Sequence, residues 1–278
     1  MFEKRVCAFI DILGFRDAVV SADSSPDFAK ELKGILDVMN SCALALNSPN
    51  LYDVVSYALK SNSKEKEEVS LPLKASEYIR STAFSDSLVI SSNSDYRGAA
   101  NLIFATILLV HELLKIGYMV RGAISSGNLY HDGSTVFGKA LVDAYELETA
   151  ISIFPRICAS DEFLSLLGQI EARPGVLSGF FAQDFDGIHM LDYLGDSCLR
   201  IASMNDPEQD WEHLKQHNRR LASRIEITGN SISRIAEKAK PNGYRVLAKL
   251  RWLVQYYRKS MSINEFYLPR DIELPNIT

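Results

Sequence analysis

The segment that most constrains the fold is Phe9-Ile10-Asp11-Ile12-Leu13-Gly14-Phe15, which continues an apolar run that begins at Val6. A short continuous apolar run followed by glycine is typical of a fully buried strand that ends in a turn. A carboxylate in such a strand is costly unless a positive group or ion meets it. We therefore expect a strand over residues 5–12 and a turn at Gly14, with Asp11 at the strand end.

After this turn the pattern alternates between helical and strand periodicity. The elements we expect, in order, are a helix from 15 to about 47, a polar exposed insertion over 48–75, strands over 77–84 and 87–92, a buried helix over 95–116, a strand over 118–126, a hairpin through Gly127 and Gly133 to Phe137, and a helix over 138–153. This order predicts an α+β fold of the ferredoxin-like split-βαβ type, with a single sheet and its helices on one face.

The remainder of the chain is mixed and then helical. We expect a helix over 161–171, short strands over 176–181 and 189–193, and helices over 211–224, 231–238 and 244–258. The resulting division is a palm-like catalytic domain over residues 1–200 and a C-terminal helical region over 205–278.

Composition limits the classes of partner. A chain of 278 residues that is 47% hydrophobic can bury a sizeable core. Its net charge of -5, without a basic run, argues against a nucleic-acid or anionic-membrane partner. The four cysteines are scattered without metal or redox spacing, which favours reduced thiols in the cytoplasm. The apolar stretch 102–110 is shorter than the roughly 20 residues of a membrane span, so we expect a buried helix there.

A second carboxylate, Asp86, falls at the tip between two expected strands. Two carboxylates that converge at strand ends can hold Mg²⁺ or Mn²⁺, and the backbone of a glycine turn that opens into a helix can bind phosphate. The alternative is that Asp11 caps the following helix and Asp86 is only a turn residue. The spacing of the residues alone does not separate the two interpretations.

Several motifs occur together in one order over about residues 5–150. They are the Asp11 segment, Phe84-Ser85-Asp86-Ser87, Val120-Arg121-Gly122-Ala123-Ile124-Ser125-Ser126-Gly127, Phe137-Gly138, and Ala144-Tyr145-Glu146-Leu147-Glu148. This order resembles the class III nucleotide cyclase domains. The resemblance implies that Asp11, Asp86 and the backbone carbonyl of Ile12 bind two Mn²⁺ or Mg²⁺ ions per active site, while Gly14 and Phe15 hold the triphosphate.

The chain departs from that family at four positions. Val142 and Glu146 stand where the family has its transition-state asparagine and arginine, and Thr82 and Thr135 stand where it has the lysine and the acid that read a purine. Either the domain is inactive, or it is a cyclase that reads another base. We favour activity because both metal carboxylates are present and threonine hydroxyls can donate to and accept from a pyrimidine edge.

Within the family the chain looks like the pyrimidine cyclases of bacterial Pycsar antiphage systems. The shared features are the insertion, the amino-acid sequence of the Asp11 segment, Pro155-Arg156-Ile157 and the helical C-terminus. The resemblance implies conversion of UTP to 3′,5′-cyclic UMP and pyrophosphate, or of CTP to cyclic CMP, with the product acting on a receptor effector in antiphage defence. It also implies a homodimer with interface active sites, in which one chain supplies the metal ligands and the other supplies Thr82 and Thr135.

Because the family's transition-state arginine is absent here, another positive group would have to take its place. The candidates are Arg121, Arg16, Lys139 and Arg156, because phosphate recognition prefers a guanidinium or a lysine ammonium. We place Arg121 first as a catalytic residue and assign Lys139, just after Gly138, to nucleotide binding.

Each of these assignments has a plainer alternative. Arg121 could pair with a surface acid, Lys139 could be a solvated helix residue, and Glu146 and Glu148 could be helix-face charges. Two rival functions also remain, namely a silent nucleotide-binding signalling module and a palm-like nucleotidyltransferase with linear products.

Overall fold

The computed structural model describes residues 1–15, 19, 30, 33–34, 36–37, 79–171, 174–204, 214–238 and 243–263, and the structural statements below concern these residues. The expected insertion over 48–75 lies outside them. Within the expected helix from 15 to about 47, the described residues 15, 19, 30, 33, 34, 36 and 37 are helical.

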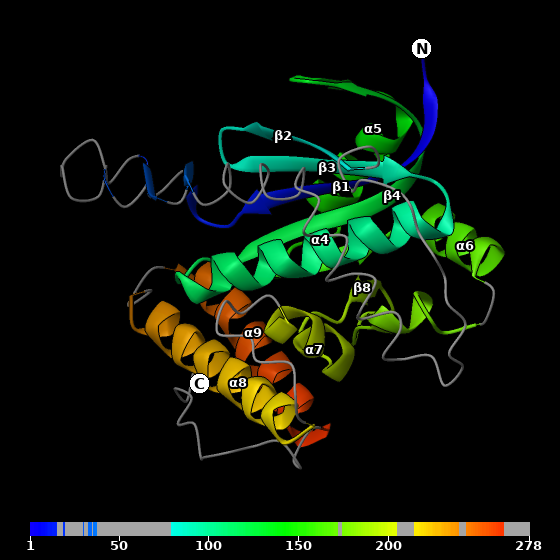
Figure 1. Cartoon of the computed structure of the whole chain (residues 1–278). Helices are drawn as coiled ribbons and strands as arrows, with labels where there is room; N and C mark the ends of the chain where they lie inside the picture. Colours follow the sequence, from blue (N-terminus) through cyan, green and yellow to red (C-terminus); the bar gives the residue numbers. More distant parts are fainter. Residues whose placement is uncertain are drawn as a thin grey trace.

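The elements keep the labels of Figure 1. The strands are β1 (Glu3–Ile12), β2 (Arg80–Phe84), β3 (Ser87–Asn93), β4 (Val120–Asp132), β5 (Thr135–Phe137), β6 (Ile157–Ala159), β7 (Phe181–Gln183) and β8 (His189–Leu191). The helices are α4 (Tyr96–Lys115), α5 (Lys139–Ala150), α6 (Asp161–Ile170), the 3₁₀ turn η2 (Ser178–Phe180), α7 (Asp196–Met204), α8 (Leu214–Lys238) and α9 (Gly243–Ile263).

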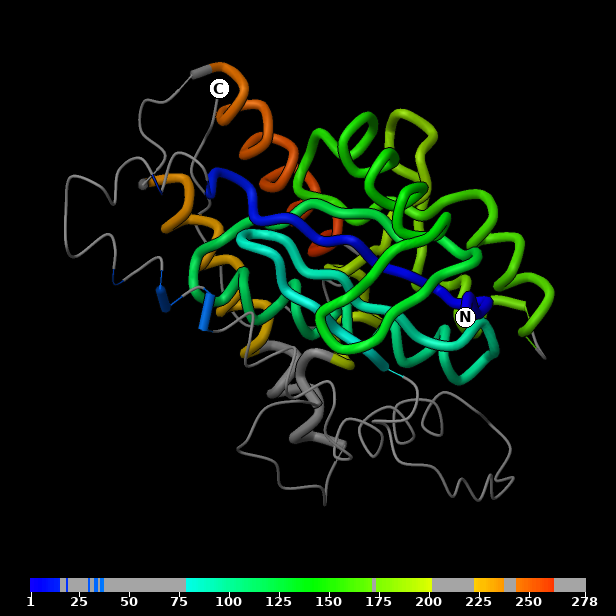
Figure 2. Tube along the Cα trace, turned by 90° about the horizontal axis from the view of Figure 1, so that it is seen from above, coloured from blue at the N-terminus to red at the C-terminus, as the bar shows by residue number. Residues whose placement is uncertain are grey.

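The sheet runs in the order β2-β3-β1-β4-β6-β8-β7, and β5 pairs with β4 outside that path. The first four strands are antiparallel, with β1 between β3 and β4, whereas β6 joins β4 in parallel. Figure 2 shows β1 in the middle of the sheet, between the neighbouring strands. The order β2-β3-β1-β4, with α4 connecting β3 to β4, is that of a ferredoxin-like split-βαβ unit. The predicted fold class is confirmed.

Strand β1 is buried on both faces, which explains why its sequence is continuously apolar rather than alternating. Val6, Ala8, Ile10 and Ile12 belong to the main core, which also contains the buried side of α4. Asp95 caps α4 by accepting a hydrogen bond of 2.7 Å from the Gly98 amide. Helix α4 is long and apolar enough to cross a membrane, but 89% of its most apolar window is buried inside the protein. The buried helix is therefore confirmed, and its burial is consistent with a soluble protein.

The prediction that all helices cover one face of the sheet is wrong, because α5 packs on the face opposite α4. There Ala140 joins a second, smaller core with Cys7, Val89 and Leu129. The chain turns into α5 at Gly138, whose φ is +143°, and a Cβ there would lie 2.5 Å from the Asn128 carbonyl oxygen. Glycine therefore lets α5 cross close over β4, as Figure 1 shows.

Three further boundary predictions are wrong. Strand β4 runs through Gly127 without a break, and a Cβ at this glycine would meet the Ala140 backbone at an ordinary contact distance of 3.4 Å. The helices expected over 211–224 and 231–238 are the single helix α8, in which buried Ile225, Thr228 and Ile232 continue one stripe. The segment expected as a strand over 176–181 forms η2 and only then β7.

The C-terminal helices share the main core with the sheet. Leu199 of α7, Ile225 of α8 and Leu253 of α9 belong to the same cluster of buried residues as β1 and α4. Figure 1 shows α8 and α9 on the side of α4 that faces away from the sheet. Cys7, Cys158 and Cys198 are buried free thiols within this structure.

Candidate active site

The end of β1 is held between its two neighbouring strands. In register, Asp11 lies opposite Ser87 of β3 and Arg121 of β4. Beyond it, the Ile12 amide donates to the Asp86 carbonyl at 3.1 Å and the Leu13 amide donates to the Met119 carbonyl at 2.9 Å. These bonds bring the β2–β3 hairpin tip, which carries Asp86, against the end of β1.

A pocket of about 600 Å³ opens at this point. It contains six of the predicted site residues, namely Asp11, Ile12, Gly14, Phe15, Asp86 and Arg121. Its wall is completed by Phe9, Leu13, Ser87, Met119, Tyr145, Glu148, Thr149, Val246 and Lys249. The convergence expected from the strand ends is therefore present in the fold.

Arg121 is held between two carboxylates. Its Nε atom donates to Asp11 Oδ2 at 3.1 Å and lies 2.6 Å from Glu148 Oε1. Because Nε carries a single hydrogen, which points to Asp11, Glu148 Oε1 contacts the charge but accepts no hydrogen bond from the described residues. Glu148 is only 2% exposed, and the Asp11 side chain 16%. The partners of Arg121 are thus site carboxylates rather than surface acids.

Hydroxyl groups complete this cluster. Ser87 Oγ donates to Asp11 Oδ1 at 3.3 Å, and Thr149 Oγ1 donates to Glu148 Oε2 at 3.0 Å. Each carboxylate therefore has one oxygen directed to Arg121 and the other to a hydroxyl.

Burial and mutual repulsion oppose ionisation of these groups. Burial raises the pKa of Asp11, Arg121 partly offsets that rise, and the nearby charge of Asp86 adds to it. Burial likewise raises the pKa of Glu148, where Arg121 opposes the rise and the charges of Asp11 and Asp86 increase it. The pocket therefore favours an added cation.

The oxygens at this site suit a hard divalent cation such as Mg²⁺ or Mn²⁺. The fitting donors are the Asp11 and Asp86 carboxylates and the Ile12 carbonyl. Within the described residues, no group of three or more histidine, cysteine, aspartate or glutamate side chains is arranged to hold a metal ion. A metal here would thus depend on two carboxylates together with backbone and substrate oxygens.

Three predicted nucleotide-binding residues lie outside the pocket. Thr82 is buried; its hydroxyl donates to the Gly133 carbonyl at 2.7 Å and lies 2.9 Å from His131 Nε2. Thr135 is exposed on β5. The Lys139 side chain is 70% exposed and pairs with Asp143 at 2.6 Å. The prediction that Thr82 and Thr135 serve a partner chain's site stays a prediction.

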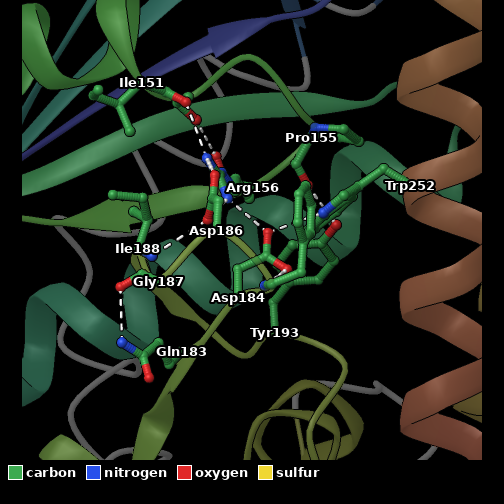
Figure 3. Close-up of polar contacts among 12 residues, drawn as sticks. Ile151, Pro155, Arg156, Gln183, Asp184, Asp186, Gly187, Ile188, Tyr193 and Trp252 are labelled. Carbon is green, nitrogen blue, oxygen red and sulfur yellow. Dashed lines mark hydrogen bonds and ion pairs between the residues drawn. The ribbon is translucent and has the colours of Figure 1, made fainter.

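Of the other two cations considered, Arg16 lies outside the described residues and Arg156 is committed elsewhere. Arg156 Nη1 lies 2.6 Å from Asp184 Oδ2, and its Nη2 lies 2.7 Å from Asp186 Oδ2. Figure 3 shows this cluster together with Trp252, and Arg156 is not among the residues that line the pocket. Of the candidate cations that the structure describes, Arg121 is the one that lines the pocket.

The pocket residues that were not predicted as site residues include Tyr145, Glu148 and Lys249. Tyr145 is half-exposed and meets the Phe9 ring edge-on, with 5.5 Å between centroids. The interpretation of Glu148 as a helix-face charge is wrong, whereas Glu146 is exposed. The buried residues of α5 are Ala140, Ala144 and Glu148, so the four-residue spacing was the available signal.

No protein-family model matches the chain, and no curated protein matches it. Among solved structures, the chain is similar to the catalytic core of a rhodopsin-guanylyl cyclase with converted specificity in complex with ATPalphaS. The two are 15% identical, the match covers 68% of this chain and 93% of that one, and the TM-score is 0.37.

Proposed function

We propose that this chain is a nucleotide cyclase that converts a pyrimidine nucleoside triphosphate, UTP in the first place, into its 3′,5′-cyclic monophosphate and pyrophosphate. The observation that carries the proposal is the convergence of Asp11, Asp86 and the Gly14 turn in one pocket at the ends of antiparallel strands. Together with the ordered motifs of the sequence, this convergence favours catalysis over the helix-capping interpretation of Asp11.

Asp11, Asp86 and the Ile12 carbonyl are the groups that would hold two Mn²⁺ or Mg²⁺ ions. Such ions, when bound, lower the pKa of the attacking hydroxyl and neutralise charge on the phosphates. For a metal ion to bind at Asp11, Arg121 must release that carboxylate. Because Glu148 also contacts Arg121 Nε, the guanidinium keeps an anchor inside the pocket.

In the proposed reaction the 3′ oxygen of the nucleotide attacks its own α-phosphorus. The new O3′–P bond forms as the bond from the α-phosphorus to pyrophosphate breaks, the proton of the 3′ hydroxyl passes to water, and negative charge moves to the leaving group. Arg121 can stabilise that charge with a guanidinium, and the backbone amides of the Gly14 turn can bind phosphate oxygens. Tyr145 and Phe9 offer ring surfaces against which a base can pack.

The choice of base is the finer part of the proposal. It is supported by the small hydroxyl side chains Thr82 and Thr135 at the positions where the resembling family reads a purine. In a homodimer these residues would come from the partner chain, and Thr82 would have to exchange its bond to the Gly133 carbonyl for one to the base. Cyclic CMP is the alternative product, and a separate receptor in antiphage defence would respond to either.

The test is product identification. Purified protein is incubated separately with ATP, GTP, CTP and UTP in the presence of Mn²⁺, and products are identified by mass spectrometry. We expect cyclic UMP, or cyclic CMP, with equimolar pyrophosphate, and no product from Asp11→Ala, which should remain a folded dimer in sedimentation. Linear or intermolecular products would instead establish a nucleotidyltransferase, and cyclic purine products would refute the base assignment.

A silent nucleotide-binding module is the second candidate function. It is favoured by Val142 and Glu146, both exposed at positions where the resembling family has transition-state residues, and by the two carboxylates that occupy Arg121. Nucleotide binding measured by calorimetry, without consumption in the assay above, would establish this alternative.

A further inference from the structure

Helix α9 brings a lysine from the C-terminal part of the chain into the pocket of Asp11. Val246 and Lys249, one helical turn apart, both line it, and Lys249 is half-buried. Figure 2 shows α9, in orange and red, beside the end of β1. The pocket is therefore not made by the ferredoxin-like unit alone.

The position of Lys249 on its helix is unusual for a lysine. Val246 packs against the core, and Leu250, Leu253 and Tyr257 are buried, so Lys249 lies on the stripe that faces the protein. Lysine ammonium groups are rarely placed on such a stripe unless they meet negative charge or reach solvent. Here the stripe leads into a pocket that is lined by carboxylates and open to a ligand.

Helix α9 is a rigid support for this lysine. Trp252 Nε1 donates to Asp184 Oδ2 at 3.0 Å, the same carboxylate that pairs with Arg156 (Figure 3). The Tyr256 hydroxyl donates to Asp192 Oδ1 at 2.6 Å. Groups on a helix fixed in this way are placed more accurately than groups on loops.

Charge balance indicates what Lys249 can bind in this pocket. The described pocket wall contains three carboxylates, from Asp11, Asp86 and Glu148, and two cations, Arg121 and Lys249. Arg121 is already shared by Asp11 and Glu148. Even with metal ions at the aspartates, a polyphosphate in this pocket needs a further positive group, and a lysine ammonium can supply it as a point charge.

We propose that Lys249 binds the phosphate chain of the nucleotide, so that the C-terminal helix α9 is part of the active site. The identity of the ligand as a nucleotide rests on the proposed function. The phosphate contact itself can be tested without turnover, using inorganic tripolyphosphate as the probe.

The experiment is a calorimetric titration of the full chain with tripolyphosphate in the presence of Mn²⁺. K249M keeps the aliphatic stem and removes the charge, so we expect its affinity to fall by about tenfold or more, the size of one charge-assisted contact. K249R should remain within about threefold of wild type because it keeps the charge. R258A, which removes an exposed cation of the same helix, should bind like wild type.

A second measurement needs no substitution. Tripolyphosphate should protect the Lys249 amine of the wild-type chain from acetylation, read by peptide mass spectrometry, whereas exposed Lys259 on the same helix should be labelled equally with and without it. Unchanged labelling of Lys249, or wild-type affinity in K249M, overturns the assignment. Lysine-dependent tripolyphosphate binding in a chain that turns over no nucleotide would support the assignment while refuting the cyclase.

Discussion

Arg121 has one Nε hydrogen but two carboxylates beside it. Only one of the two carboxylates can therefore accept a hydrogen bond from Nε. The hydrogen goes to Asp11, so among the described residues Glu148 Oε1 is held by the charge of Arg121, at 2.6 Å, and not by a hydrogen bond.

Replacing Glu148 by glutamine distinguishes a role in positioning Arg121 from a role in the stability of the fold. Glu148→Gln removes a buried carboxylate whose pKa is raised by burial, so we expect an unchanged or higher melting temperature at neutral pH. We also expect turnover to fall by roughly tenfold to a hundredfold, because a positioning residue for Arg121 loses its charge. Glu146→Gln, which changes an exposed residue of the same helix, is the matched control for both measurements. Equal turnover in the two variants would contradict this role.

The raised carboxyl pKa values also predict how stability depends on pH. Because the folded state holds protons on Asp11 and Glu148 more tightly than the unfolded state, these groups stabilise the fold below the ordinary carboxyl pKa of about 4. That contribution is lost as the pH rises through their raised pKa values. Mn²⁺ should therefore raise the melting temperature more at pH 7.5 than at pH 5. The difference should disappear in Asp11→Asn, and equal shifts at both pH values in wild type would count against a cation at these carboxylates.

At the scale of elements, the turn after β1 depends on backbone conformation. Gly14 has φ +85°, and a Cβ there would contact no atom of the described residues within 4 Å, so it is the left-handed conformation that requires glycine. Gly14→Ala should lower the free energy of unfolding by about 1 kcal/mol. Gly179→Ala is the control, because its Cβ would also enter open space but its φ is not positive. Chemical denaturation of the two variants compares them directly, and an equal loss in both would contradict this explanation.

The elements that the sequence predicts well are those in which several local signals agree. Strand β1, the β2–β3 hairpin and α4 combine apolar runs, turn residues and the Asp95 cap. Gly127 misled the prediction because a glycine inside a strand resembles, in sequence, a glycine that makes a turn. The face covered by α5 was also missed, since it depends on the close crossing at Gly138 rather than on periodicity.

The same distinction applies to the site. Asp11, Asp86 and Arg121 were predictable because strand ends in one sheet meet at one edge. Lys249 was not, because its place in the pocket depends on how the start of α9 packs beside the end of β1, a contact that no local pattern encodes. Glu148 lies between these cases, since the spacing of Ala140, Ala144 and Glu148 was visible but was interpreted as solvent-facing.

At the scale of the whole molecule, α9 is fixed by tyrosine hydroxyls as well as by its apolar face. Tyr256 donates to Asp192 and accepts from the Leu194 amide at 2.9 Å. Tyr256→Phe leaves both groups without this partner, so we expect a loss of about 1–3 kcal/mol in the free energy of unfolding. Tyr244→Phe, at a residue that is 91% exposed, should be neutral. If denaturant unfolding shows both variants to be neutral, the anchoring of α9 through Tyr256 is wrong.

The pocket wall is assembled from five separate stretches of chain, around residues 9–15, 86–87, 119–121, 145–149 and 246–249. During synthesis, domains fold from the N-terminal side as they leave the ribosome. The complete pocket therefore cannot form while α9 is still inside the exit tunnel. A nascent or prematurely terminated chain that ends before α9 lacks Val246 and Lys249, and the newly made molecule acquires the proposed polyphosphate contact only after α9 has docked.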